Sequence, residues 1–347
     1  MSKPAGPRGY RRFAASCAVA ALVPGFLFSV SGARPDGVGF RDIPFEIDGE
    51  RLTVALWYPA AGPSGRTVVG PFAMAATSEA PVGAGRYGLV LISHGTGGGR
   101  LNHRGTAIRL ARGGYVVAAP EHAGDNWRDG RYSGTFANWR RRPRQLSAAL
   151  DRVLRDPEFG RWIDHARIGA VGHSAGGYSV LALIGGRADT RLLARHCTRN
   201  RDADPAFCAY GRPGTAAGGP LPDLSDRRVR AVAAVAPVGA IFGDGAFAGV
   251  KAPVQIHRLG ADRVLRRPWH AENIARLMGN RAHLAVHPEA HHFSFISPFP
   301  AEITGEIGAP ARDPKGFDRR AFLSRIDRQL LDFFDAVLPV GSPAHGR

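Results

Sequence analysis

Apolar runs typical of buried strands alternate with helical patterns along most of this sequence. The run YGLVLISHG at residues 87–95 is almost continuously apolar, as expected for a strand buried on both faces of a sheet. Similar runs lie at residues 115–120, 167–174, 230–237, 252–259 and 282–288. Amphipathic patterns predict helices at residues 103–113, at 141–155, after Ser174, at 268–278 and at 321–337. This alternation predicts an α/β fold with a mostly parallel sheet and helices on both faces.

A hairpin is predicted ahead of the parallel strands. Residues 44–48 and 51–60 alternate in polarity, and Asp48 and Gly49 between them are typical turn residues. We therefore expect an antiparallel pair before the first buried strand.

Length and composition indicate one globular α/β domain with insertions. The chain has 347 residues, of which 44% are hydrophobic and 22% charged. Its formal net charge of +17 is large, but the basic residues, almost all Arg, are scattered along the chain. A nucleic-acid-binding protein would gather them into a stripe beside base-reading elements, so we predict no nucleic-acid partner.

The N-terminus has the pattern of a targeting segment. Basic residues precede the apolar stretch FAASCAVAALVPGFLFSV at residues 13–30, and SGA ending at Ala33 offers the small residues that a signal peptidase needs. Residues 1–33 are therefore predicted to be a signal peptide, with 34–347 forming the folded domain of an exported, periplasmic or secreted protein. The alternative is an uncleaved membrane anchor facing the periplasm, because the apolar stretch is marginally long enough to span a bilayer. No other stable membrane partner is predicted.

Residues 187–227 interrupt the alternation of strands and helices. The interval is too long for an ordinary connection, which favours an insertion folded over the substrate site as a cap. A passive surface excursion is the alternative. The insertion contains Cys197 and Cys208, and an even pair in an exported chain favours a disulfide over two reduced thiols.

Ser174 lies where a nucleophile elbow requires it. The stretch GHSAGG, residues 172–177, ends a predicted buried strand and begins a helix, with glycines that permit close backbone approach. A serine hydroxyl is a weak nucleophile until a base takes its proton, so this hypothesis requires a histidine and a carboxylate later in the chain.

Two aspartates could supply the carboxylate. Asp262 follows a predicted strand at the edge of the sheet where ligand-facing loops gather. Asp244 follows the preceding strand, but it also fits a simple turn in GDG, so Asp262 is favoured.

The base is expected after the last strand, at His291 or His292. A zinc site built from His287, His291 and His292 is conceivable, but no nearby Asp or Cys pattern completes it, and no metal is predicted. Three other histidines fall in polar stretches and are predicted to be solvated: His103, His165 and His196.

An acyl-transfer site also needs donors for an oxyanion. The backbone N–H of Ala175, next after the nucleophile, is the first. The glycine-rich loop SHGTGGG at residues 93–99 supplies the second, for which we select Thr96. The alternative for this loop is a flexible turn without a binding role.

These motifs carry a family resemblance. LISHGTGGGRLNH, GYVVAAPEHAGDN, RIGAVGHSAGGYSVLALIGG, the paired cysteines and AHHFSFISPF resemble the exported, predicted dienelactone hydrolases. Those proteins are relatives of platelet-activating factor acetylhydrolase in the α/β-hydrolase superfamily. The resemblance covers most of residues 40–337 and implies an α/β-hydrolase fold, a Ser174, Asp262 and His292 triad, and oxyanion donors at Thr96 and Ala175.

The sequence departs from that family at two positions. Dienelactone hydrolases have a cysteine nucleophile where this chain has Ser174, so the family name does not assign the substrate. The closing motif typically has glycine where this chain has His291.

The predicted function is a serine hydrolase that cleaves carboxylic esters, small or lipid-like, through an acyl-enzyme. It needs no cofactor. The alternatives are an acyltransferase or amidase with the same triad, and a non-catalytic envelope binding protein. The binding protein should lack a catalytic group, and none is visibly missing. Fold resemblance alone would not decide among them.

Overall fold

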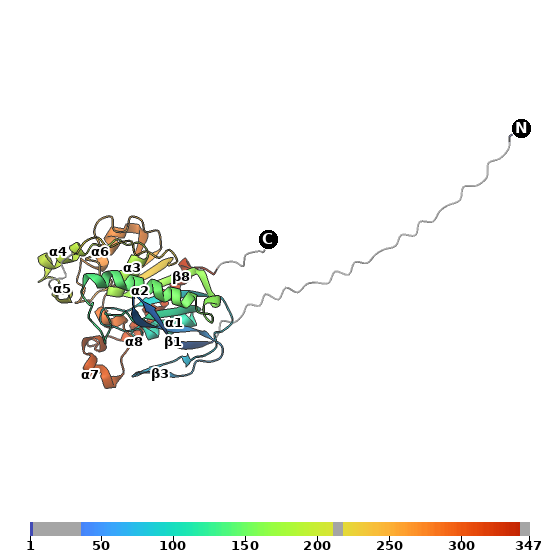
Figure 1. Ribbon diagram of the computed structural model, residues 1–347, viewed down its shortest axis with the longest axis horizontal. Coiled ribbons are helices and arrows are strands. Elements are labelled where there is room, and N and C mark those ends of the chain that lie inside the picture. The colour runs from blue at the N-terminus through green and yellow to red at the C-terminus, as the bar shows by residue number, and fades with distance from the viewer. Residues whose placement is uncertain (3–35, 211–217, 341–347) are drawn as a thin grey trace. The chain divides into compact units, whose positions relative to one another are not determined.

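The computed structural model describes residues 1–2, 36–210 and 218–340. The chain divides into two units, Met1–Ala33 and Arg34–Arg347, and the second contains the fold described below (Figure 1). Nearly all of the predicted signal peptide, and the part of the insertion at residues 211–217, lie outside the described residues. Within the described part of the chain, every helix is too short or too polar to cross a bilayer.

The described residues form a large mixed sheet. The order across the sheet is β11 (Ala282–His287), β10 (Val254–Leu259), β9 (Ala231–Val235), β8 (Ile163–His173), β6 (Tyr87–Ser93), β7 (Tyr115–Pro120), β2 (Glu50–Ala60), β1 (Gly37–Ile47) and β5 (Thr77–Ser78). The first six strands in this order, β11 to β7, are parallel, and β2 joins them antiparallel through β7. The predicted parallel sheet is confirmed.

The predicted hairpin is β1 and β2. Ile47 pairs with Glu50, and Asp48 and Gly49 turn the chain with positive φ angles of 52° and 74°. Both central positions of a tight hairpin turn need positive φ, which Asp tolerates and Gly adopts freely. The strand β1 begins at Gly37, earlier than the alternating pattern indicated.

Two hydrophobic cores lie on opposite faces of the sheet. Along β6, Leu89 and Leu91 join one core while Val90 and Ile92 join the other, since side chains alternate between faces. The first core includes residues of α2, α3 and α6, and the second includes residues of α1 and α8. The described helices are α1 (Arg104–Arg112), α2 (Phe136–Leu154), α3 (Ala175–Leu183), α4 (Thr190–Asn200), α5 (Pro205–Tyr210), α6 (Ala271–Met278), α7 (Thr304–Ile307) and α8 (Arg319–Val337).

Helix α2 starts earlier than the predicted boundary at residue 141. Thr135 caps it by accepting a hydrogen bond from the N–H of Asn138, so the helix begins at Phe136. The apolar face formed by Leu146, Leu150 and Val153 is buried as expected. The capping residue Thr135 therefore determines where the helix begins, whereas the apolar pattern predicts only which face of the helix is buried.

Short elements occupy segments for which the sequence pattern predicted neither a helix nor a strand. The strands β3 (Thr67–Val69) and β4 (Phe72–Met74) form a small separate sheet, and α7 lies between β11 and α8. Segments this short carry too few residues for a recognisable period, so only tertiary contacts specify them.

Asp327 in α8 should make stability depend on pH. It is buried and accepts a hydrogen bond from Thr106 Oγ1 of α1 at 2.7 Å, and burial raises its pKa to about 7. The ordinary pKa of this carboxyl group is about 4. Between about pH 4 and pH 7 the folded state therefore binds more protons than the unfolded state, and the free energy of unfolding falls as the pH rises through this range. We expect Asp327→Asn to raise the free energy of unfolding at pH 8 by about 2 to 4 kcal/mol.

The measurement is denaturant unfolding of the Asp327→Asn variant and the parent at pH 4 and pH 8. At pH 4 the difference should nearly vanish, because the carboxyl is then protonated in the folded protein. Asp332→Asn, at an exposed position of the same helix, serves as the control for the substitution itself. Equal stability of Asp327→Asn and the parent at pH 8 would contradict the raised pKa.

Candidate active site

Ser174 occupies a sharp turn between β8 and α3. Its φ of 57° and ψ of −118° are rare for a residue with a side chain, and its N–H donates to the carbonyl of Val235 at 3.0 Å. The neighbouring glycines permit this turn. A Cβ on Gly172 would lie 2.0 Å from the carbonyl oxygen of Gly176, and one on Gly176 would lie 2.0 Å from that of Ser93. The predicted strand-to-helix elbow is therefore present.

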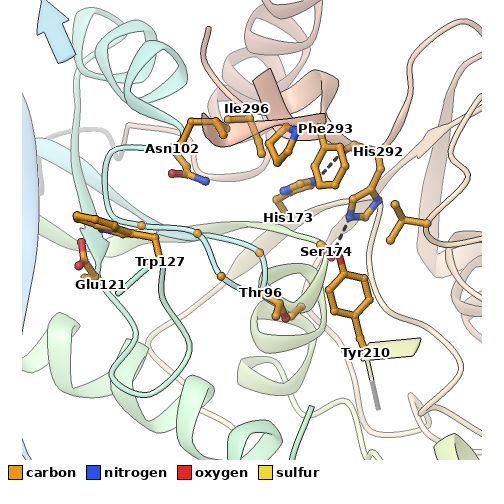
Figure 2. Close-up of a pocket in the computed structure, with 18 of the residues that line it drawn as sticks. Thr96, Asn102, Glu121, Trp127, His173, Ser174, Tyr210, His292, Phe293 and Ile296 are labelled. Atoms are coloured by element: carbon orange, nitrogen blue, oxygen red, sulfur yellow. Dashed lines mark hydrogen bonds between the residues drawn. The ribbon is translucent and has the colours of Figure 1, made fainter. Parts of the chain in front are cut away.

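His292 links Ser174 to Asp262. Its Nε2 lies 3.1 Å from Ser174 Oγ (Figure 2). On the other side of the ring, its Nδ1 lies 2.7 Å from Asp262 Oδ2. The backbone carbonyl of His292 accepts a hydrogen bond from His173 Nε2 at 2.8 Å. Because a carboxylate only accepts, Nδ1 carries the proton toward Asp262 and Nε2 is free to accept from the serine hydroxyl.

Asp262 is oriented by its own loop. It follows β10, and its Oδ1 accepts the backbone N–H groups of Val264 at 2.7 Å and Leu265 at 2.9 Å. The other candidate, Asp244, has an 89% exposed side chain and pairs with Arg276. The structure therefore brings Asp262, and not Asp244, to the histidine.

The neighbouring histidines have other partners. His291 Nε2 lies 3.2 Å from Asp313, and His287 Nε2 lies 3.0 Å from Nδ1 of His257. The three imidazoles considered for a zinc site therefore make separate contacts.

The loop at residues 94–99 lies against Ser174. A Cβ on Gly95 would come within 3.2 Å of the Ser174 Cβ, and Thr96 lines the same pocket as Ser174 and Ala175. Among the described residues, no acceptor binds the N–H of Thr96. Ala175 is the first residue of α3, so its N–H has no acceptor within the helix. Both predicted donors therefore have N–H groups available to a ligand.

Ser174 opens into a pocket of about 570 Å³ with mostly apolar walls. Its aromatic lining residues are Phe72, Trp127, Trp139, Phe207, Tyr210, Phe293 and Phe299. Trp127 and Tyr210 are more than half exposed, which leaves apolar surface facing solvent at the mouth. This volume is typical of sites for small organic ligands.

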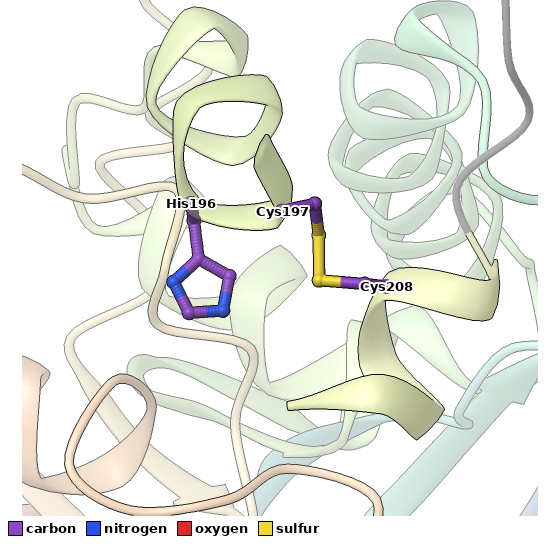
Figure 3. A group of neighbouring side chains, drawn as sticks. All are labelled: His196, Cys197 and Cys208. Atoms are coloured by element: carbon purple, nitrogen blue, oxygen red, sulfur yellow. A yellow bond between two sulfur atoms is a disulfide. The ribbon is translucent and has the colours of Figure 1, made fainter. Parts of the chain in front are cut away.

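The insertion forms part of the pocket wall. Leu193 and Cys197 from α4, and Phe207 and Tyr210 from α5, line the pocket. Cys197 and Cys208 form the predicted disulfide, which joins the two helices (Figure 3). The described part of the insertion therefore has the position expected of a cap.

His196 and His103 are buried, so the prediction that they are solvated is wrong, while His165 is exposed as expected. His196 and His270 both contact Asp204 Oδ2, at 2.9 and 2.8 Å. Although burial opposes it, these hydrogen bonds hold the pKa of Asp204 at about 2. The sequence did not predict the contact of His196 with Asp204 and His270. Its neighbours in the sequence are polar, and His270 comes from a distant part of the chain.

The same group has metal-ligand side chains within 4.8 Å of one another. The Nδ1 atom of His196 faces the amide nitrogen of Asn200, and that of His270 accepts the N–H of Gly239. Each Nε2 therefore carries the proton given to Asp204. The group is satisfied as a hydrogen-bonded anchor between α4 and the start of α6.

Known proteins share the fold of this chain. Residues 64–129 match the family described as platelet-activating factor acetylhydrolase, isoform II. A ferulic acid esterase from Streptomyces cinnamoneus superposes with a TM-score of 0.61 at 20% identity, covering 91% of this chain and 94% of its own. The chain has an α/β-hydrolase fold. The match to the acetylhydrolase family covers the loop at residues 94–99 but none of Ser174, Asp262 and His292.

Other α/β-hydrolase-fold structures are also similar. A dienelactone hydrolase-like promiscuous phosphotriesterase from metagenomic libraries has a TM-score of 0.53 at 16% identity, covering 87% of this chain and 99% of its own. An acylaminoacyl peptidase from Pyrococcus horikoshii has a TM-score of 0.51 at 13% identity, covering 89% of this chain and 43% of its own. No curated protein matches the chain by sequence.

Proposed function

We propose that this protein is a serine hydrolase that cleaves carboxylic esters through an acyl-enzyme intermediate. The observation that carries the proposal is the hydrogen-bonded series from Ser174 Oγ to His292 and from His292 to Asp262, in which Ser174 and His292 line an apolar pocket. A nucleophile, a base within hydrogen-bond reach and a group that orients the base are the parts that acyl transfer requires.

In the first half-reaction, Ser174 Oγ attacks the ester carbonyl carbon while His292 Nε2 takes the hydroxyl proton. Asp262 holds the Nδ1 proton and stabilises the imidazolium that results. The negative charge that forms on the carbonyl oxygen is received by the N–H groups of Thr96 and Ala175. The tetrahedral intermediate then collapses, the C–O bond to the alcohol breaks, and His292 gives its proton to the departing oxygen.

In the second half-reaction, water replaces the alcohol. His292 takes a proton from this water, which attacks the acyl carbon, and the same two N–H groups receive the oxyanion. Collapse releases the carboxylic acid and returns the proton from His292 to Ser174. The chemistry needs proton transfers and an oxyanion site, all available from this chain's own groups.

We propose that the substrates carry a bulky apolar or aromatic group. The pocket walls favour such groups, and each buried methylene contributes about 0.8 kcal/mol. The superposed structure named as a ferulic acid esterase is consistent with an aromatic acid in a fold of this kind.

A series of esters tests this function and substrate class. We expect p-nitrophenyl butyrate to be cleaved with a kcat/KM about tenfold above that of p-nitrophenyl acetate, since two more methylenes enter the pocket. Methyl ferulate tests whether an aromatic acid is accepted. A preference for acetate would contradict the bulky substrate, and rates equal to those of Ser174→Ala for every ester would contradict esterase activity.

We also propose that the protein is exported. The pattern at residues 1–33 and the disulfide between Cys197 and Cys208 both suit an oxidising compartment. N-terminal sequencing of the protein from an expressing cell should find a chain that starts near Arg34.

Asp262→Asn should lower kcat by about 10⁴-fold while the protein stays folded. The backbone N–H groups of Val264 and Leu265 already bind one side-chain oxygen, so the new amide carbonyl must remain with them and its NH₂ must face His292. An N–H at that point favours the tautomer with Nε2 protonated, which cannot accept the serine proton.

The check is steady-state kinetics with p-nitrophenyl butyrate. Asp244→Asn is the matched control, and its rate should equal that of the parent because this side chain is exposed. If Asp262→Asn kept the parent rate and Asp244→Asn lost it, the carboxylate would be Asp244.

A further inference from the structure

A buried ion pair contacts the loop at residues 94–99, here called the oxyanion loop because it contains the proposed donor Thr96. Arg142 of α2 and Asp125 have fully buried side chains, and Arg142 Nη1 donates to Asp125 Oδ2 at 2.6 Å. Burying two charges costs several kcal/mol per ion, and apolar residues of similar volume often give equal or higher stability. A gain in stability therefore does not explain why this ion pair is buried. The other hydrogen bonds of Arg142 and Asp125 give the explanation.

Asp125 holds the far end of the loop. Its Oδ1 accepts the N–H of Gly97 at 3.2 Å and the hydroxyl of Ser133 at 2.6 Å. Its Oδ2 accepts from Asn138 at 2.7 Å in addition to Arg142. Gly97 has a φ of 67°, so the chain bends sharply there, directly after Thr96.

Arg142 holds the near end of the loop and also reaches α3. Its Nη2 donates to the backbone carbonyl of His94, two residues before Thr96. Its Nε lies 3.3 Å from the hydroxyl of Ser179, which in turn donates to the carbonyl of Ala175 at 2.9 Å. A planar guanidinium can serve these directions together, whereas a lysine ammonium cannot reproduce the fork.

The surrounding histidines are neutral, so they add no competing charge. Burial lowers the pKa of His94 to about 3 and holds that of His122 well below its usual range. His94 Nδ1 donates to the carbonyl of Gly95, and its Nε2 accepts the N–H of His122. Arg142 and Asp125 are therefore the charged members of an otherwise neutral cluster.

We infer that Arg142 and Asp125 are positioning residues that hold the two oxyanion donors, Thr96 and Ala175, at the correct separation. The inference rests on the proposed esterase function. Arg142 and Asp125 bind the loop on both sides of Thr96, and Arg142 reaches the first turn of α3 through Ser179. A donor contributes only when it points at the developing oxyanion, so a loop displaced by a fraction of an ångström loses catalysis with little loss of substrate binding.

The test is Arg142→Lys, which keeps a positive charge beside Asp125 but cannot bind His94 and Ser179 at the same time. The matched control is Arg167→Lys, because Arg167 is also buried and bonds the carbonyl of Leu338 and the hydroxyl of Tyr115, near the start of β8 and away from Ser174. Each variant is measured for kcat, KM, unfolding temperature and inhibition by an alkyl trifluoromethyl ketone, whose serine adduct places an oxyanion in the site.

For Arg142→Lys we expect kcat to fall about 10- to 100-fold while KM changes less than about threefold, with the ketone inhibition constant rising in parallel with the loss in kcat. Arg167→Lys should lose unfolding temperature but keep kcat and ketone affinity. If Arg142→Lys lost no more kcat than Arg167→Lys, or lost kcat with unchanged ketone affinity, the inference would be wrong.

Ser179→Ala covers the case in which Arg142→Lys does not fold. It removes one hydroxyl between Arg142 and Ala175 and should lower kcat about 3- to 10-fold at unchanged KM. An unchanged kcat in this variant would overturn the link to α3. Reaction of the wild-type protein with a fluorophosphonate distinguishes failure of the proposed function from failure of the positioning role. If Ser174 of the wild-type protein does not react, the proposed function is wrong. If it reacts and the variants behave like the wild-type protein, only the positioning role is wrong.

Discussion

Ser174→Ala should abolish ester hydrolysis, with a loss in kcat of at least about 10⁴-fold, while the protein stays folded. The expected loss is large because the acyl-enzyme cannot form without the hydroxyl, and binding groups and oxyanion donors alone give only residual catalysis. Folding should survive because alanine keeps the Cβ at a position with φ of 57° and loses one hydrogen bond to His292. The measurement is turnover of p-nitrophenyl butyrate together with the unfolding temperature.

Ser179→Ala is the matched control for removing a serine hydroxyl near this site, since its smaller expected loss leaves the acyl-enzyme intact. Activity of Ser174→Ala within tenfold of the parent would contradict the assignment of the nucleophile. A large loss accompanied by a collapsed unfolding temperature would instead show that Ser174 is needed for folding.

The second large effect is expected at two adjacent histidines. His292→Ala should lower kcat by several orders of magnitude, because it removes the proton acceptor 3.1 Å from Ser174 Oγ. His291→Ala should lower kcat less than about tenfold, since that imidazole contacts Asp313 at 3.2 Å. The two substitutions remove the same side chain one residue apart, so each controls for the other.

Parallel kinetics with one ester separate the two histidines. The hydrogen bonds between His291 and Ser294 use the backbone N–H and carbonyl of His291, so they remain in the alanine variant and the short helix at His292–Phe295 should stay folded. If His291→Ala lost the activity and His292→Ala kept it, the base would be His291.

The sequence predicted the parallel sheet, and the structure places Ser174, Asp262 and His292 at one edge of it for one physical reason. Each follows the carboxyl end of a parallel strand, and those ends meet at one edge of the sheet. Chain order therefore placed Ser174, Asp262 and a histidine at position 291 or 292 at this edge, and the family resemblance selected His292. The choice between Asp262 and Asp244 needed coordinates, because both follow strands.

The cluster behind the oxyanion loop was not predicted, although the sequence contains one signal for it. Arg142 lies four residues before Leu146 and eight before Leu150, on the apolar face of α2. A charge on a buried face needs a partner, and that requirement could have directed attention to this position. The sequence could not identify Asp125 as the partner of Arg142. Asp125 lies in the loop after β7, and a loop has no periodic pattern from which its position could be predicted.

The burial of His103 and His196 was missed for a related reason. Each lies among polar neighbours in the sequence, but its contacts come from segments far along the chain: Phe295 for His103, and His270 through Asp204 for His196. Local polarity predicts exposure only when no distant polar partner satisfies the group.

The most direct test of the central claim is the intact mass of the purified protein after treatment with a small fluorophosphonate, with Ser174→Ala alongside. An activated serine attacks phosphorus and displaces fluoride, so the account predicts one adduct on the wild-type protein and none on the variant. No adduct on folded wild-type protein, or an equal adduct on both, would contradict an activated nucleophile at Ser174.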